Sequence, residues 1–146
     1  MFKGGPACEV FVETLLRYRD QGAYLLHAFV LMPDHFHVLL TPSTGLTLER
    51  AVQYIKGGSA HRIGKELEMR FPVWQRGFSD HRIRDANDYA THVRYIEKNP
   101  VTRKLVTVAN GYPWSSAAGC FRLDEPPQGL KPQVGDASDG TAEAVP

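Results

Sequence analysis

The chain has 146 residues, of which 42% are hydrophobic, 23% charged and 10% aromatic, enough for one folded domain with its own core. No apolar run approaches the roughly 18 residues that a membrane helix needs, and no signal peptide is visible. Cys8 and Cys120, the two cysteines, stand far apart. This pattern excludes a disulfide-stapled scaffold and a four-cysteine zinc site, and it favours a cytoplasmic location.

The net charge of +1 hides an uneven distribution along the chain. Residues 123–146 carry five acidic groups and one basic group, whereas residues 1–122 carry 16 basic and 11 acidic groups. The last segment is also rich in proline and has no aromatic residue. We therefore predict a mildly basic domain over residues 1–122, with an N-terminal truncation to be considered, and a disordered acidic tail over residues 123–146.

The first half of the domain begins with a helix. Residues 7–20 place apolar side chains at helical spacing, and a glutamine–glycine pair ends the pattern. Residues 24–32 form a continuous apolar run typical of a buried strand, and residues 35–41 form a second strand. Pro33 and Asp34 between them predict a tight turn, so the two strands are expected to form a hairpin.

The second half adds two helices and a further strand. Residues 46–67 have an apolar stripe at helical spacing, and residues 73–83 suggest an extended segment. Residues 85–99 predict a helix that Asp85 caps and that ends before Pro100. The order of elements predicts an α+β fold, an antiparallel sheet with helices packed on it.

The densest chemical signal is His35-Phe36-His37 within the second strand. Strand alternation places both imidazoles on one face, with Cα atoms about 6.5–7 Å apart, and turns Phe36 to the other face. Two histidines held in this way can share one metal ion. The alternative is a pair of hydrogen-bonded histidines on a half-exposed strand, and the motif alone leaves both interpretations open.

A second signal lies at the end of the last helix. Tyr95 and Asn99 are four residues apart, so both point from one helix face. A tyrosine hydroxyl can act as a nucleophile, and a carboxamide oxygen suits a divalent ion such as Mg²⁺ or Mn²⁺. Taken singly, Tyr95 also fits a half-buried helical aromatic residue, and Asn99 fits a helix end before proline.

Four blocks in this order closely resemble one family, the REP-associated tyrosine transposases, which belong to the single-tyrosine HUH transposases. The resemblance covers about residues 8–118. The blocks are Phe29-Val-Leu-Met-Pro-Asp34 followed by His35-Phe36-His37, Val73-Trp-Gln-Arg-Gly-Phe78, Tyr95-Ile-Glu-Lys-Asn-Pro-Val101 and Tyr112-Pro-Trp-Ser-Ser116.

This resemblance implies a ferredoxin-like HUH sheet and an enzyme that nicks and rejoins single-stranded or hairpin DNA. Carried over by position, His35, His37 and Asn99 match the ligands of a divalent metal, Mg²⁺ or Mn²⁺, and Tyr95 matches the nucleophile that forms a 5′-phosphotyrosine. Family members act as monomers or as homodimers. The alternatives are a non-catalytic nucleic-acid-binding module of the same fold and a metal hydrolase that does not need Tyr95.

Basic and aromatic side chains near these blocks are candidates for DNA contacts, because phosphates attract cations and bases stack on flat rings. The alternative is a solvated charged face, with the tryptophan as a packing residue. The candidates are Lys56, Arg62, Trp74, Arg76, Arg94, Lys98, Arg103 and Lys104. Other histidines and tyrosines are excluded from the site. His27 is expected to be buried and hydrogen-bonded, and His61, His81 and His92 lack a matching partner. Tyr89 points to a different helix face from Tyr95, and Tyr54 lacks the Asn-Pro context.

The sequence departs from the family pattern at two places. The family begins with a central strand before the first helix, and nothing before residue 7 is long enough to form it. We expect its absence to expose apolar surface and backbone hydrogen-bonding groups. Arg103 and Lys104 stand where family members commonly have alanine and glycine, which predicts the loss of a left-handed glycine position.

Overall fold

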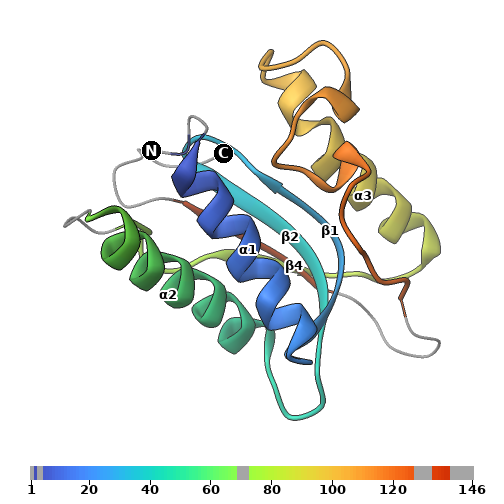
Figure 1. Ribbon diagram of the computed structural model, residues 1–146. Coiled ribbons are helices and arrows are strands. Elements are labelled where there is room, and N and C mark those ends of the chain that lie inside the picture. The colour runs from blue at the N-terminus through green and yellow to red at the C-terminus, as the bar shows by residue number, and fades with distance from the viewer. Residues whose placement is uncertain (1, 3–4, 69–72, 127–132, 139–146) are drawn as a thin grey trace.

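The computed structural model describes residues 2, 5–68, 73–126 and 133–138 of the chain. Three helices and four strands follow one another along it (Figure 1), with two short 3-10 helices at Ala109–Gly111 and Ser116–Ala118. The elements are α1 (Pro6–Asp20), β1 (Tyr24–Leu31), β2 (His35–Pro42), α2 (Leu48–Leu67), β3 (Ser79–Arg82), α3 (Ala86–Thr102) and β4 (Gln133–Ser138).

The strands form one antiparallel sheet in the order β1-β2-β4-β3. Helices α1 and α2 lie side by side on one face, and α3 lies on the other (Figure 1). The predicted α+β class with helices on an antiparallel sheet is confirmed. None of the helices in the described residues has the length and apolar character that crossing a bilayer requires.

Strand alternation on β2 divides the core into two layers. Phe36, Val38 and Leu40 pack toward α1 and α2, whereas Leu39 packs toward α3 with Ile96. A fully buried side chain of this size contributes about 1.5–3 kcal/mol to folding. Because His35 and His37 have the same parity as Leu39, the fold turns both imidazoles toward α3.

Strand β4 corrects part of the expectation that residues 123–146 are disordered, an expectation that for residues 127–132 and 139–146 lies outside the described residues. Residues Gln133–Ser138 pair with β2 on one side and β3 on the other. Asp124 is also fixed, because its carboxylate accepts hydrogen bonds from the Arg19 side chain and from the Leu26 amide. The tail composition predicted disorder because the segment has few apolar side chains. Backbone hydrogen bonds to β2 and to β3 order residues 133–138 nevertheless.

The same strand corrects the expectation of an empty central position in the sheet. Among the described residues no strand precedes α1, and β4 occupies the place between β2 and β3. Val134 of β4 is buried in the layer that faces α3, and Gly135 faces α2. A Cβ atom on Gly135 would lie 2.9 Å from Val52 Cγ2, so only glycine allows α2 to approach this closely.

The third strand is shorter than predicted. Strand β3 covers Ser79–Arg82, whereas the sequence suggested an extended segment over residues 73–83. The segment before β3 serves the core instead, because the Trp74 ring stacks on Phe2 and contacts Phe11 and Phe36. Burial of a large aromatic ring prevails here over the local preference for a strand.

Helix α3 begins as predicted and ends later. The Asp85 side chain accepts the backbone N–H of Asp88, which confirms Asp85 as the N-cap. The helix continues through Pro100 to Thr102, since the missing N–H of proline removes one hydrogen bond without stopping the turn. Lys104 beyond it has φ 61°, so the left-handed position is kept by lysine and not lost.

Candidate active site

His35 and His37 form a buried pair on β2. The two side chains are 1% and 2% exposed, and their Nε2 atoms lie 3.0 Å apart. At metal–nitrogen bonds of about 2.1 Å, this separation corresponds to an angle of about 90° at a shared ion, the angle between neighbouring ligands of an octahedral cation. The expected pairing of the two imidazoles on one face is thus present in the structure.

Each imidazole is held from behind by a carboxylate. Asp34 Oδ1 lies 2.6 Å from His35 Nδ1, and Asp136 Oδ1 makes a very short contact with His37 Nδ1. Because an ionised carboxylate only accepts hydrogen bonds, each Nδ1 carries a proton, and the neutral form of each ring then has its lone pair on Nε2, free for a metal. Burial lowers the pKa of His35, which favours the neutral form that binds metals.

Asn99 reaches this pair from α3. Its side chain is 5% exposed, and Nδ2 lies 3.3 Å from His37 Nε2. Its Oδ1 atom is buried and has no hydrogen-bond partner in the described part of the chain. An orphaned buried oxygen of this kind costs about 1–3 kcal/mol, which a cation beside it would offset. Two imidazole nitrogens and this oxygen make a donor set that fits a divalent metal.

Tyr95 lies at the open side of the same group. It precedes Asn99 by about one helical turn, and its ring centroid is 5.5 Å from that of His37. Its side chain is 54% exposed, so the phenol is accessible to a bound strand while the ligand atoms stay buried. Strand β2 and helix α3 thus bring together all four residues that the sequence singled out for metal binding and nucleophilic attack.

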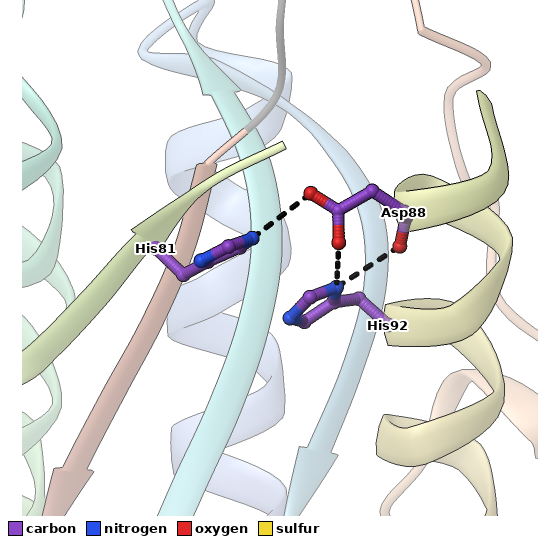
Figure 2. A group of neighbouring side chains, drawn as sticks. All are labelled: His81, Asp88 and His92. Atoms are coloured by element: carbon purple, nitrogen blue, oxygen red, sulfur yellow. Dashed lines mark hydrogen bonds and ion pairs between the residues drawn. The ribbon is translucent and has the colours of Figure 1, made fainter. Parts of the chain in front are cut away.

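A second cluster anchors the start of α3. Asp88 of α3 lies between His81 of β3 and His92 of α3, with carboxylate-to-nitrogen distances of 2.9 and 3.0 Å (Figure 2). The hydrogen bond from His81, together with the one from the Arg84 backbone, holds the pKa of Asp88 well below its ordinary value. The sequence interpretation gave these histidines no partner; the structure shows that both share Asp88.

The ligand atoms of this cluster are close enough for one metal ion, within 4.8 Å of one another. The two imidazole rings, however, stack with 16° between their planes and centroids 4.5 Å apart. An ion bound in the plane of one ring would lie well outside the plane of the other. The arrangement therefore fits a hydrogen-bonded link between β3 and α3, which fixes the helix that carries Tyr95 and Asn99.

Three of the predicted DNA contacts have structural roles. The Lys56 ammonium donates to the backbone carbonyls of Gln75 and Gly77, and burial lowers its pKa. Arg62 forms ion pairs with Glu13 and Glu66. The partly buried Trp74 ring packs in the core, and its Nε1–H donates to Ser59.

The remaining predicted contacts are all exposed: four lie on α3 or directly after it, and Arg76 lies in the segment before β3. None of them forms an ion pair with another residue that the structure describes. Burial is the main cause that lowers the pKa of His35, and the hydrogen bond from His35 is the main one that lowers the pKa of Asp34 against the opposing effect of burial. The positive charge of Arg103 adds a smaller lowering at both groups, so this side chain acts on the site itself. The four that lie on α3 or directly after it are Arg94, Lys98, Arg103 and Lys104.

The structure adds two residues that the sequence interpretation did not assign. Asp34 directly precedes His35, so its role could have been found from adjacency. Asp136 lies 99 positions beyond His37 and inside the presumed tail, so no local signal points to it. The expectation for His27 is confirmed: it is buried and bonded to the Asp124 carbonyl and to Thr41.

Comparison with known proteins adds independent information. The family model described as "Transposase IS200 like" matches residues 5–99. This range runs from the start of α1 to Asn99, and it includes the histidine pair and Tyr95.

Two curated relatives share sequence over much of the chain. A Haemophilus influenzae protein named "Putative REP-associated tyrosine transposase" is 32% identical over 99 residues, which cover 61% of this chain and 56% of that protein. The "REP-associated tyrosine transposase" of Escherichia coli (strain K12) is 29% identical over 118 residues, which cover 77% of this chain and 68% of that protein. The chain thus spans little more than half of the Haemophilus relative.

A solved structure supports the same relationship. A REP-associated tyrosine transposase bound to a REP hairpin has a similar fold, with a TM-score of 0.63 and 25% sequence identity. The similarity covers 82% of this chain and 73% of the solved one.

Proposed function

The chain belongs to the IS200-like transposase family, and on this premise we propose that it cuts and rejoins single-stranded or hairpin DNA through a covalent 5′-phosphotyrosine. The observation that carries the proposal is the convergence of Tyr95, His35, His37 and Asn99 from β2 and α3. A packing role would explain each residue alone. It does not explain why the half-exposed Tyr95 phenol lies beside the His35–His37 pair and the unpaired Asn99 oxygen.

The first step is attack of the Tyr95 hydroxyl oxygen on the scissile phosphorus. A bond forms between this oxygen and phosphorus, the bond from phosphorus to the 3′-oxygen breaks, and the 3′-oxygen leaves as a hydroxyl after taking a proton. The exposure of Tyr95 allows its own proton to pass to solvent. A second 3′-hydroxyl can reverse the step and join a different strand, because the phosphotyrosine keeps a phosphodiester bond.

The residues that would hold Mg²⁺ or Mn²⁺ are His35 and His37 through Nε2, and Asn99 through Oδ1. A divalent ion bound there would supply positive charge to the oxygens of the scissile phosphate. The chain's own part is to orient both imidazoles through Asp34 and Asp136, and to favour the neutral form of His35 through burial, which lowers its pKa.

The DNA partner that fits best is a hairpin with a single-stranded flank. The supporting observations are the row of exposed cations on and after α3, next to Tyr95, and the hairpin bound by the structural relative. Contacts from Arg94, Lys98, Arg103 and Lys104 to phosphates would hold the strand in place without reading its sequence. One copy of the chain holds all four residues of the site, so we propose that a monomer is sufficient for cleavage.

The experiment is an adduct assay on the wild-type chain with a labelled hairpin DNA and Mn²⁺. We expect a protein–DNA adduct that resists denaturing electrophoresis, that disappears with a chelator, and that is lost in Tyr95→Phe while hairpin affinity changes less than about threefold. Tyr54→Phe, on the exposed part of α2, is the matched control and should keep the adduct.

Three results would contradict the proposal. An adduct that persists in Tyr95→Phe would remove the assigned nucleophile. Cleavage without any adduct, unaffected by Tyr95→Phe, would indicate a metal hydrolase, and salt-sensitive binding with no cleavage at all would indicate a non-catalytic DNA-binding module.

A further inference from the structure

Strand β4 brings a carboxylate to the back of the metal-binding pair. In the register of β2 and β4, Asp136 lies directly opposite His37, and its Oδ1 accepts the hydrogen of His37 Nδ1. Side chains that face each other across an antiparallel pair have Cβ atoms about 4.5–5.5 Å apart, so a side chain as short as aspartate can reach the imidazole. His37 has no other partner at Nδ1 in the described part of the chain.

The position of β4 is defined by more than this contact. The strand pairs with β2 and β3 at once, buries Val134 and places Gly135 under Val52 of α2. Alternation along the strand puts Val134 and Asp136 on the face that meets α3, where the site lies. When β4 pairs in the sheet, it therefore also places the Asp136 carboxylate beside His37.

We propose that β4 completes the metal site, with Asp136 as the positioning residue for His37, so that docking of this strand and binding of a divalent cation stabilise each other. The inference rests on the proposed function only for the identity of the metal ligands. A carboxylate behind a ligating histidine fixes the ring and its tautomer, and loss of such a partner typically weakens metal binding about 10–100-fold.

The two imidazoles differ in how their partners arrive. Asp34 is adjacent to His35 in the chain, so its contact with His35 does not depend on β4. Asp136, in contrast, reaches His37 only when β4 is paired in the sheet. The metal affinity of the site is consequently coupled to the C-terminal segment. By thermodynamic linkage, a bound cation must in turn hold β4 in place by the same free energy.

The first test measures His37 directly, without metal and without DNA. Imidazole ¹⁵N NMR of the full chain should show His37 in a single tautomer with the proton on Nδ1. In Asp136→Ala this signature should be lost for His37 and kept for His35. A His37 spectrum that does not change in Asp136→Ala would overturn the proposal.

The second test measures Mn²⁺ affinity from the electron paramagnetic resonance signal of the free ion. We expect Asp136→Ala to bind Mn²⁺ about 10–100-fold more weakly than wild type. Asp80→Asn is the matched control, because it removes one negative charge from the exposed face of the neighbouring strand β3, and it should bind as wild type. Equal Mn²⁺ affinity in Asp136→Ala and wild type would overturn the proposal.

Asp136→Asn covers the case in which the alanine variant does not fold. The side chain has nearly the same shape and keeps a neutral acceptor for Nδ1–H, so the His37 tautomer should persist and Mn²⁺ affinity should fall less than in alanine, about threefold. Wild-type affinity in Asp136→Asn, together with failure of the alanine variant to fold, would reduce Asp136 to a structural role and overturn the proposal.

The third test addresses docking of the strand. Gly135→Val places a side chain where Val52 leaves no room, so it should displace β4 and reproduce the loss of Mn²⁺ affinity with Asp136 intact. In wild type, Mg²⁺ should slow hydrogen exchange of the β4 amides. Exchange that is indifferent to Mg²⁺ would contradict the linkage.

These readouts separate the inference from the proposed function. If no DNA adduct forms while Mn²⁺ affinity depends on both His35 and Asp136, the inference stands and the transposase chemistry falls. If the Tyr95-dependent adduct forms at wild-type rate and at limiting Mn²⁺ in Asp136→Ala, the chemistry stands and the inference falls.

Discussion

Lys104 adopts a left-handed backbone conformation, which lowers the free energy of unfolding relative to glycine at the same position. It has φ 61°, and the N–H groups of Lys104 and Leu105 donate to the carbonyls of Val101 and Pro100 at 2.9 and 2.8 Å. This is the Schellman arrangement, in which the left-handed position favours glycine. The family resemblance predicts glycine at this position, and the structure keeps the glycine conformation with a lysine in it.

Lys104→Gly should therefore stabilise the protein. Relief of the left-handed strain is worth about 1 kcal/mol relative to a residue with a Cβ atom. Lys104→Ala is the matched control, because it removes the same charge and keeps the strain. We expect chemical denaturation to give Lys104→Gly a free energy of unfolding about 1 kcal/mol above that of Lys104→Ala; equal values would contradict a left-handed residue at this site.

At this scale the sequence predicted well where the signal is local. The spacing of His35 and His37 on a strand, and of Tyr95 and Asn99 on a helix, determines which side chains share a face. The sequence could not supply Asp136, because strand pairing across 99 positions has no local signature. Nor could it distinguish the exposed basic residues from Lys56 and Arg62, which have structural partners. These partners include Gln75, Gly77 and Glu13, which lie in other parts of the fold.

The element that matters most for the site is α3, because it carries Tyr95 and Asn99. Its start is fixed by Asp85 as N-cap and by Asp88, which holds His81 and His92 (Figure 2). The sequence predicted this helix from Asp85 and from its apolar stripe. It placed the end at Asn99, because proline disfavours the helical conformation of the preceding residue. The structure continues the helix to Thr102 with Pro100 buried inside it, so this local preference does not decide the helix end.

The carboxylate of Asp88 makes the anchoring of α3 sensitive to acid. Its pKa in the folded protein lies well below the ordinary value of 3.8, with the hydrogen bond from His81 as the first cause. A depressed carboxyl pKa contributes stability that is present above the unfolded-state value and that is lost as pH falls toward the folded-state value.

Asp88→Asn should consequently destabilise the protein at pH 6, and the difference from wild type should shrink steadily below about pH 4. Thermal unfolding from pH 6 to pH 2 measures this dependence. Asp80→Asn, on exposed β3, is the control and should run parallel to wild type over the whole range. A constant difference between Asp88→Asn and wild type at all pH values would contradict the account.

At the scale of the whole molecule, the sheet is completed by the end of the chain. The order β1-β2-β4-β3 puts the C-terminal strand between the histidine strand and β3 (Figure 1). The sequence predicted the family and the α+β class, and both are confirmed. It could not predict β4 from the composition of residues 123–146. This strand is held by backbone hydrogen bonds to β2 on one side and to β3 on the other, and composition does not reveal such partners.

The central claim is that Tyr95 becomes covalently attached to the 5′-phosphate of the cut strand. Digestion of the adduct with nuclease and protease, followed by peptide mass spectrometry, tests it most directly. The account predicts a residual nucleotide on the peptide that contains Tyr95, linked through its 5′-phosphate, with a free 3′-hydroxyl on the released strand. A nucleotide on any other residue, or a 3′-phosphate linkage, would contradict it.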